Sequence, residues 1–252
     1  MYKIFANTLF TGRQLVFVPE CHSTNSLASE LASKSVLSEG SVIITSNQTA
    51  GRGQRGNTWE TAAGMNLTFS ILLKPTFLSL KSQFYLTIIT SLAVADFLKE
   101  QSIEEVKIKW PNDILASKKK ICGILIENSV QQETIHQSIV GIGLNINQDN
   151  FSSPSATSLA IVAKKTFDLN DALNSLLEKF EKRYLQLRGG KLAELKSEYL
   201  ENLFGFGKSQ SFISNGKEFE GTIEGVDETG ELKVSDNGIV SSFKLKEIAL
   251  KY

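Results

Sequence analysis

The chain has 252 residues, of which 41% are hydrophobic and 21% charged, as in an ordinary globular protein. Its 27 Lys and Arg residues balance its 27 Asp and Glu residues, so we expect neither nucleic acid nor a membrane surface as a partner. No run of about 18 apolar residues predicts a transmembrane helix, and the first residues lack the apolar core of a signal peptide. Cys21 and Cys122 show no metal-ligand spacing, and two free thiols indicate a reducing compartment, which we expect to be the cytoplasm.

Strand-like and helix-like segments alternate along the first 204 residues. Ser23, Thr24 and Asn25 are capping residues ahead of an i, i+3, i+4 apolar pattern, which predicts the start of a helix. The further elements expected in this region are strands over 42–45, 66–73, 106–110 and 138–147, a hairpin joining 114–115 to 124–126, and helices over 84–98 and 171–187. This mixture predicts an α+β domain.

The last 48 residues, 205–252, have a different pattern. Asn215-Gly216 and Asn237-Gly238 suit two-residue hairpin turns, because both central residues of such turns need positive φ. Asp227 to Gly230 is a third turn signal. Four or five short strands between these turns predict a small SH3-like or OB-like barrel. We therefore expect two domains, 1–204 and 205–252.

The first stretch that suits a ligand is Gly51-Arg52-Gly53-Gln54-Arg55-Gly56. Glycines let the backbone N–H groups approach a ligand, and arginines bind phosphate or carboxylate. The stretch therefore indicates an anion site, although a flexible, solvated surface loop would have the same composition. It is not a phosphate-binding loop of the Walker type, since no Gly-Lys-Ser/Thr follows.

A second cluster of polar residues, Lys109-Trp110-Pro111-Asn112-Asp113, closes a predicted strand. Pro111 restricts the backbone there, so the side chains are aimed reproducibly. Asp113 could bind Mg²⁺ through oxygen, and Lys109 could face a phosphate. The alternative is a plain solvated turn. In the lysine run 118–120 that follows, Lys120 could point into a pocket while the other two face water.

Small and large residues alternate over Val140–Asn147, so that its glycines share one face of a strand. A bare face permits close approach of a ligand, and close helix packing on the strand is an equal alternative. This strand could also be a sheet edge, available for dimerisation or for docking an acceptor protein.

Taken in order, these stretches resemble the biotin protein ligase family, and the resemblance covers nearly the whole chain. The matching motifs are Ser23-Thr24-Asn25, Gln48 with Gly51-Arg52-Gly53 and Trp59, Lys109-Trp110-Pro111-Asn112-Asp113, Lys120 with Gly123-Ile124-Leu125-Ile126-Glu127, and Gly141-Ile142-Gly143-Leu144-Asn145. The resemblance implies a mixed sheet with helices on one side, as in the class II aminoacyl-tRNA synthetase and biotin ligase catalytic domains, followed by an SH3-like barrel.

The same resemblance implies that biotin and ATP form biotinyl-adenylate with Mg²⁺, and that the adenylate acylates a lysine of biotin carboxyl carrier protein. The residues then expected to act in catalysis are Arg52, Lys109, Asp113 and Lys120, with Asp113 also as metal ligand. The residues expected to bind biotin or ATP are Ser23, Thr24, Asn25, Gln48, Gly51, Arg52, Gly53, Arg55, Trp59, Asn112, Lys120, Gly123, Gly141 and Asn145.

The chain departs from the family pattern at Gln54 and Asn57, where the glycine-rich loop often carries arginine. Some relatives carry an N-terminal DNA-binding domain, but the residues before Ser23 are too few for one, so we expect no repressor role. Two alternatives stay open: a lipoate or octanoate ligase of the same fold, and a non-catalytic module that binds biotin or a nucleotide. A monomer and a homodimer are both compatible with the sequence.

Overall fold

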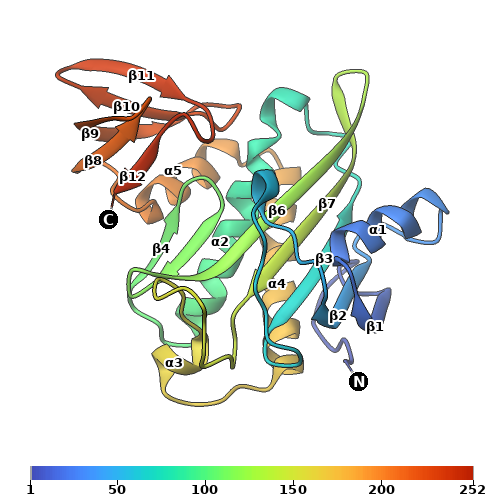
Figure 1. Cartoon of the computed structure of the whole chain (residues 1–252). Coiled ribbons are helices and arrows are strands. Elements are labelled where there is room, and N and C mark those ends of the chain that lie inside the picture. Colours follow the sequence, from blue (N-terminus) through green and yellow to red (C-terminus); the bar gives the residue numbers. More distant parts are fainter. Residues whose placement is uncertain (1, 252) are drawn as a thin grey trace.

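A computed structural model describes residues 2–251, and of Arg55 it describes the backbone alone. The chain forms two sheets (Figure 1). The larger has seven strands in the order β1-β2-β3-β7-β6-β5-β4, and only β1 and β2 run parallel. These strands are β1 (Leu15–Cys21), β2 (Val42–Gln48), β3 (Leu67–Leu73), β4 (Val106–Lys109), β5 (Asp113–Ala116), β6 (Lys119–Gln131) and β7 (Thr134–Leu144).

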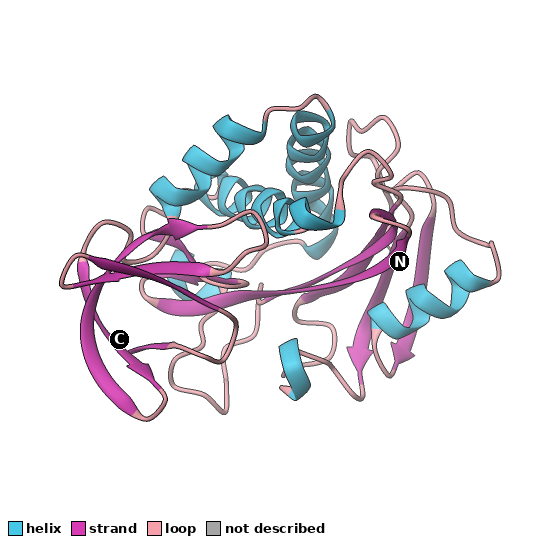
Figure 2. Ribbon diagram, turned by 90° about the horizontal axis from the view of Figure 1, so that it is seen from above, coloured by secondary structure: helices cyan, strands magenta, loops and turns pink. Residues whose placement is uncertain are grey.

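The long helices cover one face of this sheet, as the sequence predicted (Figure 2). The helices of the domain are α1 (Thr24–Ser33), α2 (Phe84–Glu100), α3 (Leu159–Ala163), α4 (Leu169–Arg188) and α5 (Leu192–Asn202). Helix α2 packs on α4, α5 and strands β4 to β6. Alternate residues of the central strands, such as Ile44, Phe69 and Val140, are fully buried in this core.

The opposite face of the sheet carries only a small apolar cluster. Ala28 of α1 packs there on Ile43, Leu72 and Ile139 of β2, β3 and β7. Helix α1 therefore covers one end of this face and leaves its middle, along β3, β7 and β6, to other segments. None of the described helices is long and apolar enough to cross a membrane.

The five-stranded sheet follows α5 in the order β11-β10-β9-β8-β12. Its strands are β8 (Ser209–Ser214), β9 (Lys217–Val226), β10 (Leu232–Asp236), β11 (Ile239–Phe243) and β12 (Ala249–Lys251). All its pairings are antiparallel, as an SH3-like module requires. Asn215 and Asn237 have the positive φ, 49° and 48°, that the hairpin dipeptides predicted.

The two sheets share one apolar core, because buried residues of the small sheet, among them Ile223 and Leu232, join the cluster of the large one. The Trp110 indole N–H donates to the Gly230 carbonyl at 2.8 Å. Gly230 lies against Phe84, where a Cβ atom would come within 2.3 Å of the ring. These contacts place the small sheet firmly beside the end of β4; a boundary between 204 and 205 stays a prediction.

One sequence expectation is wrong. The strand expected over Val140–Asn147 is not a free edge, since β7 is hydrogen-bonded to β3 on one side and to β6 on the other. Its last seven residues, from Ser138 to Leu144, are all buried without alternation, which is typical of a strand enclosed in a sheet. Docking or dimerisation through the backbone of this strand is therefore excluded.

Candidate functional site

A cavity of about 230 Å³ opens on the middle of the sheet face that the long helices do not cover. The N-terminus of α1, the loop between β2 and β3, strands β5, β6 and β7, and the turn before β12 all contribute to its wall. The cavity brings together most of the residues that the sequence singled out. These are Ser23, Thr24, Asn25, Gln48, Arg52, Gly53, Trp59, Asn112, Asp113, Lys120, Gly123 and Gly141.

The floor of the cavity is built from glycines that face it across two paired strands. A Cβ atom at Gly141 would lie 2.3 Å from Asn25 Oδ1, and one at Gly143 would lie 2.4 Å from Trp59 Cε2. At Gly123 the Trp59 ring would be 2.9 Å away. Only hydrogen fits at these three positions, so the bare face lets the Trp59 ring lie directly on the sheet.

Lys120 and Asp113 form an ion pair at one end of the cavity, with Lys120 Nζ 2.7 Å from Asp113 Oδ1. The same ammonium lies 5.5 Å from the centre of the Trp59 ring. Lys118 and Lys119, by contrast, are exposed, as the sequence analysis proposed. The cavity therefore has a cation and a carboxylate together beside an aromatic face.

A β-bulge aims Lys120 into the cavity. Asp113 pairs with Gly123 and Leu115 pairs with Lys120, so that β6 has one residue more than β5 over this stretch. In regular alternation Lys120, three residues before Gly123, would point to the opposite face. The extra residue reverses this phase and puts the lysine on the same face as Gly123 and Asp113.

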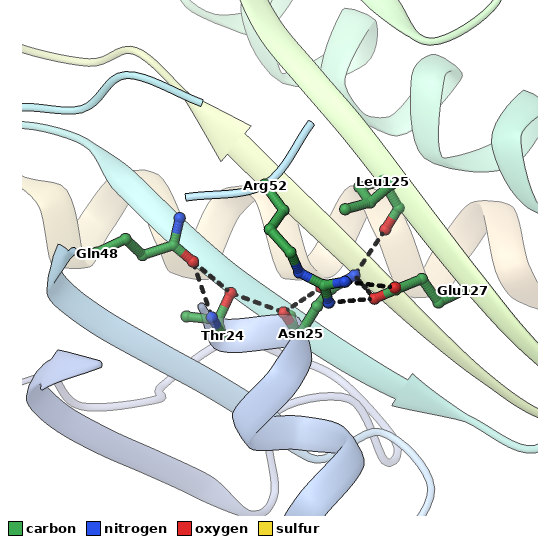
Figure 3. A network of polar contacts seen from close by, with 7 residues as sticks. Thr24, Asn25, Gln48, Arg52, Leu125 and Glu127 are labelled. Carbon is green, nitrogen blue, oxygen red and sulfur yellow. Dashed lines mark hydrogen bonds and ion pairs between the residues drawn. The ribbon is translucent and has the colours of Figure 1, made fainter. Parts of the chain in front are cut away.

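A chain of hydrogen bonds runs along the other end of the cavity (Figure 3). The Thr24 backbone N–H donates to Gln48 Oε1 at 2.8 Å. The Ser70 hydroxyl lies 2.8 Å from Thr24 Oγ1 and 2.6 Å from Asn25 Oδ1. Thr24, Asn25 and Ser70 are buried, and their mutual bonds fix the side chains in one arrangement.

The hydrogen-bond chain reaches the glycine-rich loop through Glu127, which the sequence analysis assigned no role. Arg52 donates to both carboxylate oxygens of Glu127, at 3.0 and 2.9 Å, and Asn25 Nδ2 donates to Glu127 Oε2 at 2.8 Å (Figure 3). Glu127 thus joins the loop arginine to the N-terminus of α1. Its only sequence signal was its place at the end of the motif that starts at Gly123.

Four expected site residues are not part of the described cavity wall. Gly51 supports the loop from behind, since its carbonyl accepts the Trp59 N–H at 3.0 Å. Lys109 lies on β4, one strand further from the cavity, where it pairs with Asp113 of β5. Asn145 is buried, and its amide donates to the Thr157 carbonyl at 3.0 Å, a structural contact. The side chain of Arg55 lies outside the described residues.

Within the described residues, no three His, Cys, Asp or Glu side chains come together to hold a metal ion. Asp113 is the carboxylate that the cavity wall offers, and a single carboxylate suits Mg²⁺ only where a ligand's phosphates supply further oxygens. The Cys122 thiol is fully buried beside Gly123, and burial raises its pKa. This thiol is therefore a protonated, inert core group and no nucleophile.

Comparison with known proteins decides the family. A model described as the Biotin/lipoate A/B protein ligase family matches residues 18–145, about half of the chain. The chain belongs to this family. The matched residues carry every predicted site residue from Ser23 to Asn145, and the shared cavity is therefore the candidate active site of a biotin/lipoate A/B protein ligase.

Individual relatives agree. The chain is 30% identical to the "Bifunctional ligase/repressor BirA" of Bacillus subtilis over 95% of its own length and 74% of that protein. It is 29% identical to the "Biotin--[acetyl-CoA-carboxylase] ligase" of Mycobacterium tuberculosis, over 90% of this chain and 85% of the relative. Its structure is similar to that of the biotin protein ligase from Aquifex aeolicus in complex with biotin and ATP, with a TM-score of 0.80, 25% identity, and 95% and 99% of the two chains covered.

Proposed function

We propose that this protein activates biotin with ATP and transfers the biotinyl group to a lysine of biotin carboxyl carrier protein. The observation that carries the proposal is the cavity with Lys120 and Asp113 at one end and the Thr24–Gln48 hydrogen bonds at the other. The relatives named as biotin ligases, and the similar structure with biotin and ATP, support the same substrates. A cytoplasmic location is part of this proposal.

In the first half-reaction a biotin carboxylate oxygen attacks the α-phosphorus of ATP. A mixed anhydride forms, the bond to the β-phosphate bridging oxygen breaks, and pyrophosphate leaves. Two anions must approach each other, so fixed cations have to stabilise the negative charge that develops at phosphorus. Lys120, held at the cavity wall by the bulge and by Asp113, supplies one, and Arg52 of the glycine-rich loop supplies another.

The uncharged end of the cavity suits the head group of biotin. Ser23, Thr24 and Gln48 line it with hydroxyl and amide groups, and their neighbours hold them in place. A urea-like head group needs both donors and acceptors, which such side chains provide. The glycine floor lets the Trp59 ring lie directly on the strands, so a flat ligand would pack against this ring.

In the second half-reaction the amine of the acceptor lysine attacks the acyl carbon. An amide forms, the acyl–phosphate bond breaks, AMP leaves, and the amine loses a proton. Asp113 is the group we assign to orient that amine, and it would also hold Mg²⁺ together with the phosphates of ATP. Mg²⁺ supplies further charge neutralisation when bound. The glycine-rich loop, which lines the cavity together with Trp59, would exclude water from the anhydride.

The test is pyrophosphate release with ATP and Mg²⁺, comparing biotin, lipoate, octanoate and no acid. Among these acids we expect only biotin to cause pyrophosphate release, and we expect the rate of release to fall by a factor of roughly 100 or more in Lys120→Ala. Lys119→Ala is the matched control, because this neighbouring lysine is exposed and should leave the rate unchanged. Release with lipoate or octanoate would identify a ligase for those acids, and no release with any acid would leave a binding protein without turnover.

A further inference from the structure

The head-group end of the cavity is closed by a wall of hydrogen-bonded side chains. Asn25 lies directly on the floor, because a Cβ atom at Gly141 would be only 2.3 Å from Asn25 Oδ1. Glu127 Oε2 accepts from Asn25 Nδ2 at 2.8 Å, and the two oxygens of the same carboxylate accept from Arg52 at 3.0 and 2.9 Å. Asn25, Glu127 and Arg52 therefore connect the floor to the glycine-rich loop in one layer (Figure 3).

A second hollow, with a volume of about 390 Å³, lies behind this wall. Arg52 borders both spaces, whereas Asn25 borders the cavity and Glu127 borders the hollow. The hollow lies beside α1 and strands β6 and β7, and its other lining residues are Ser26, Ser29, Asn128, Ser129, Gln137 and Ile139. The wall therefore separates two spaces that would join if it were removed.

Asn25 meets the cavity with its hydrogen-bond donors already engaged. Its Nδ2 atom donates to the Leu125 carbonyl at 3.1 Å as well as to Glu127. The Ser70 hydroxyl donates to Asn25 Oδ1 at 2.6 Å, and Asn25 is buried. An amide has two N–H groups, so this one has none left to donate to a ligand. Its effect on a ligand is therefore chiefly steric.

We propose that Asn25, Arg52 and Glu127 limit the size of the head group that the site accepts, with Glu127 as the positioning residue. This inference rests on the proposed function, because it takes the head group of biotin as the part of the ligand held at this end. A larger head group has to displace Asn25 or Arg52, and the bonds of both to the Glu127 carboxylate oppose this. Without that carboxylate, Arg52 loses two hydrogen bonds and Asn25 loses one, so both side chains can turn aside.

The test compares biotin with two analogues that carry a propyl group on one or the other urea nitrogen. Wild type should release pyrophosphate readily with biotin and far more slowly with both analogues. In Glu127→Ala we expect the kcat/KM of the better analogue, divided by that of biotin, to rise at least about tenfold, the factor by which a pocket distinguishes one methylene group. A merely structural role of Glu127 would lower both values alike and leave this ratio unchanged.

Two variants of the same strand are the controls. Glu127→Gln keeps the size of the side chain and an oxygen that accepts hydrogen bonds, so its ratio should stay close to that of wild type. Ser129→Ala changes an exposed residue that borders the hollow on the same face of β6, and its ratio should not change.

In case Arg52 alone still blocks the opening, the double variant Arg52→Ala/Glu127→Ala removes more of the wall. An unchanged ratio in both Glu127→Ala and the double variant, each shown to be folded by urea unfolding, would overturn the inference. Equal use of biotin and an analogue by wild type would overturn it as well, while turnover of biotin upholds the proposed function.

The proposed function fails if wild type releases no pyrophosphate with biotin, and binding then tests the wall. Titration calorimetry measures the Kd values of biotin and the two analogues for wild type and Glu127→Ala. A gain in the relative affinity of an analogue in Glu127→Ala supports the inference. The same relative affinity in both proteins, or no binding of biotin to wild type, overturns it.

Discussion

Gly143→Ala would place a methyl group where the Trp59 ring now lies. The added Cβ atom would be 2.4 Å from Cε2, 2.6 Å from Nε1 and 2.7 Å from Cζ2 of that ring. Carbon atoms in contact are normally about 3.5–4.0 Å apart, so the ring has to move by about 1 Å or more. The backbone of Trp59 is tied to Gly51 at 3.0 Å, and the ring therefore has to rotate away from the sheet.

The free-energy terms separate stability from function. Crowding a packed site costs roughly 1–3 kcal/mol, while replacing glycine by alanine within a strand returns about 0.5–1 kcal/mol. If the Trp59 ring rotates away from the sheet, the unfolding free energy changes by less than about 2 kcal/mol. The cost then falls on ligand binding, for which the ring has to return to its place on the sheet. Binding of ATP should then weaken by roughly 5- to 150-fold, which is what 1–3 kcal/mol amounts to.

The assay combines urea unfolding, tryptophan emission and the KM for ATP. The chain has two tryptophans, and the Trp59 Nε1 atom is buried without a hydrogen-bond partner among the described groups. We expect the emission of Gly143→Ala to shift to longer wavelength as this indole meets water. Gly189→Ala, at the end of α4 and away from the cavity, is the control for a glycine-to-alanine change. An unshifted emission together with a wild-type KM would refute this account of the glycine floor.

Three further outcomes follow from contacts described above. Arg52 and Glu127 are 44% and 40% exposed, so their ion pair should stabilise the fold by only about 0.2–1 kcal/mol. Glu127→Gln should nevertheless speed the loss of the adenylate from the site. This effect should disappear in an Arg52→Ala background, and additive effects of the two changes would contradict a shared role. Burial alone would raise the pKa of the Glu181 carboxyl, but backbone N–H groups of residues 9–11 donate to it and hold its pKa below the usual range. A carboxyl whose pKa is lowered by folding stabilises the fold above its unfolded-state pKa, and this stability is lost as the pH falls through its folded-state pKa. Glu181→Gln should thus lower the unfolding free energy by about 1.5–3 kcal/mol at pH 7, and the difference from wild type should shrink below about pH 4. A difference that stays constant from about pH 7 to 3 would disprove this role of the Glu181 carboxylate. Trp110→Phe removes the bond to the Gly230 carbonyl and should lower the unfolding free energy by about 1 kcal/mol, with faster proteolysis before β8; unaltered stability and cleavage would count against this contact as an anchor.

The sequence predicted the elements whose patterns are local. The helix expected over 84–98 is α2, which is apolar on nearly all sides, and that over 171–187 is α4, which carries an apolar stripe on one face; both patterns are strong signals. Strand β1 was missed, since Pro19 and Glu20 interrupt its apolar run. Helix α5 was missed although Leu192, Leu195 and Tyr199 carry a helical spacing, because no capping residue announces it.

Site residues were predicted where chemistry and local phase suffice, and missed where the partner is far along the chain. Lys120 was singled out by its place in the lysine run, yet simple alternation would have turned it away from the cavity. Glu127 accepts its hydrogen bonds from Arg52, which lies 75 positions away in the sequence, and the turn that contains Lys246 reaches the cavity wall from another sheet. Neither contact has a local pattern, because long-range pairing of strands and sheets brings them to the cavity.

Because of the bulge, the number of residues in β6 decides whether Lys120 faces the cavity. Lys120 stays on the cavity side only because β6 has one residue more than its partner there. Removing Ile121 would keep the charge, the composition and most of the core, and would still turn the lysine toward the helices. We therefore expect evolution to exchange residues in this hairpin more freely than it adds or deletes one, and a single-codon deletion to be more harmful here than most substitutions.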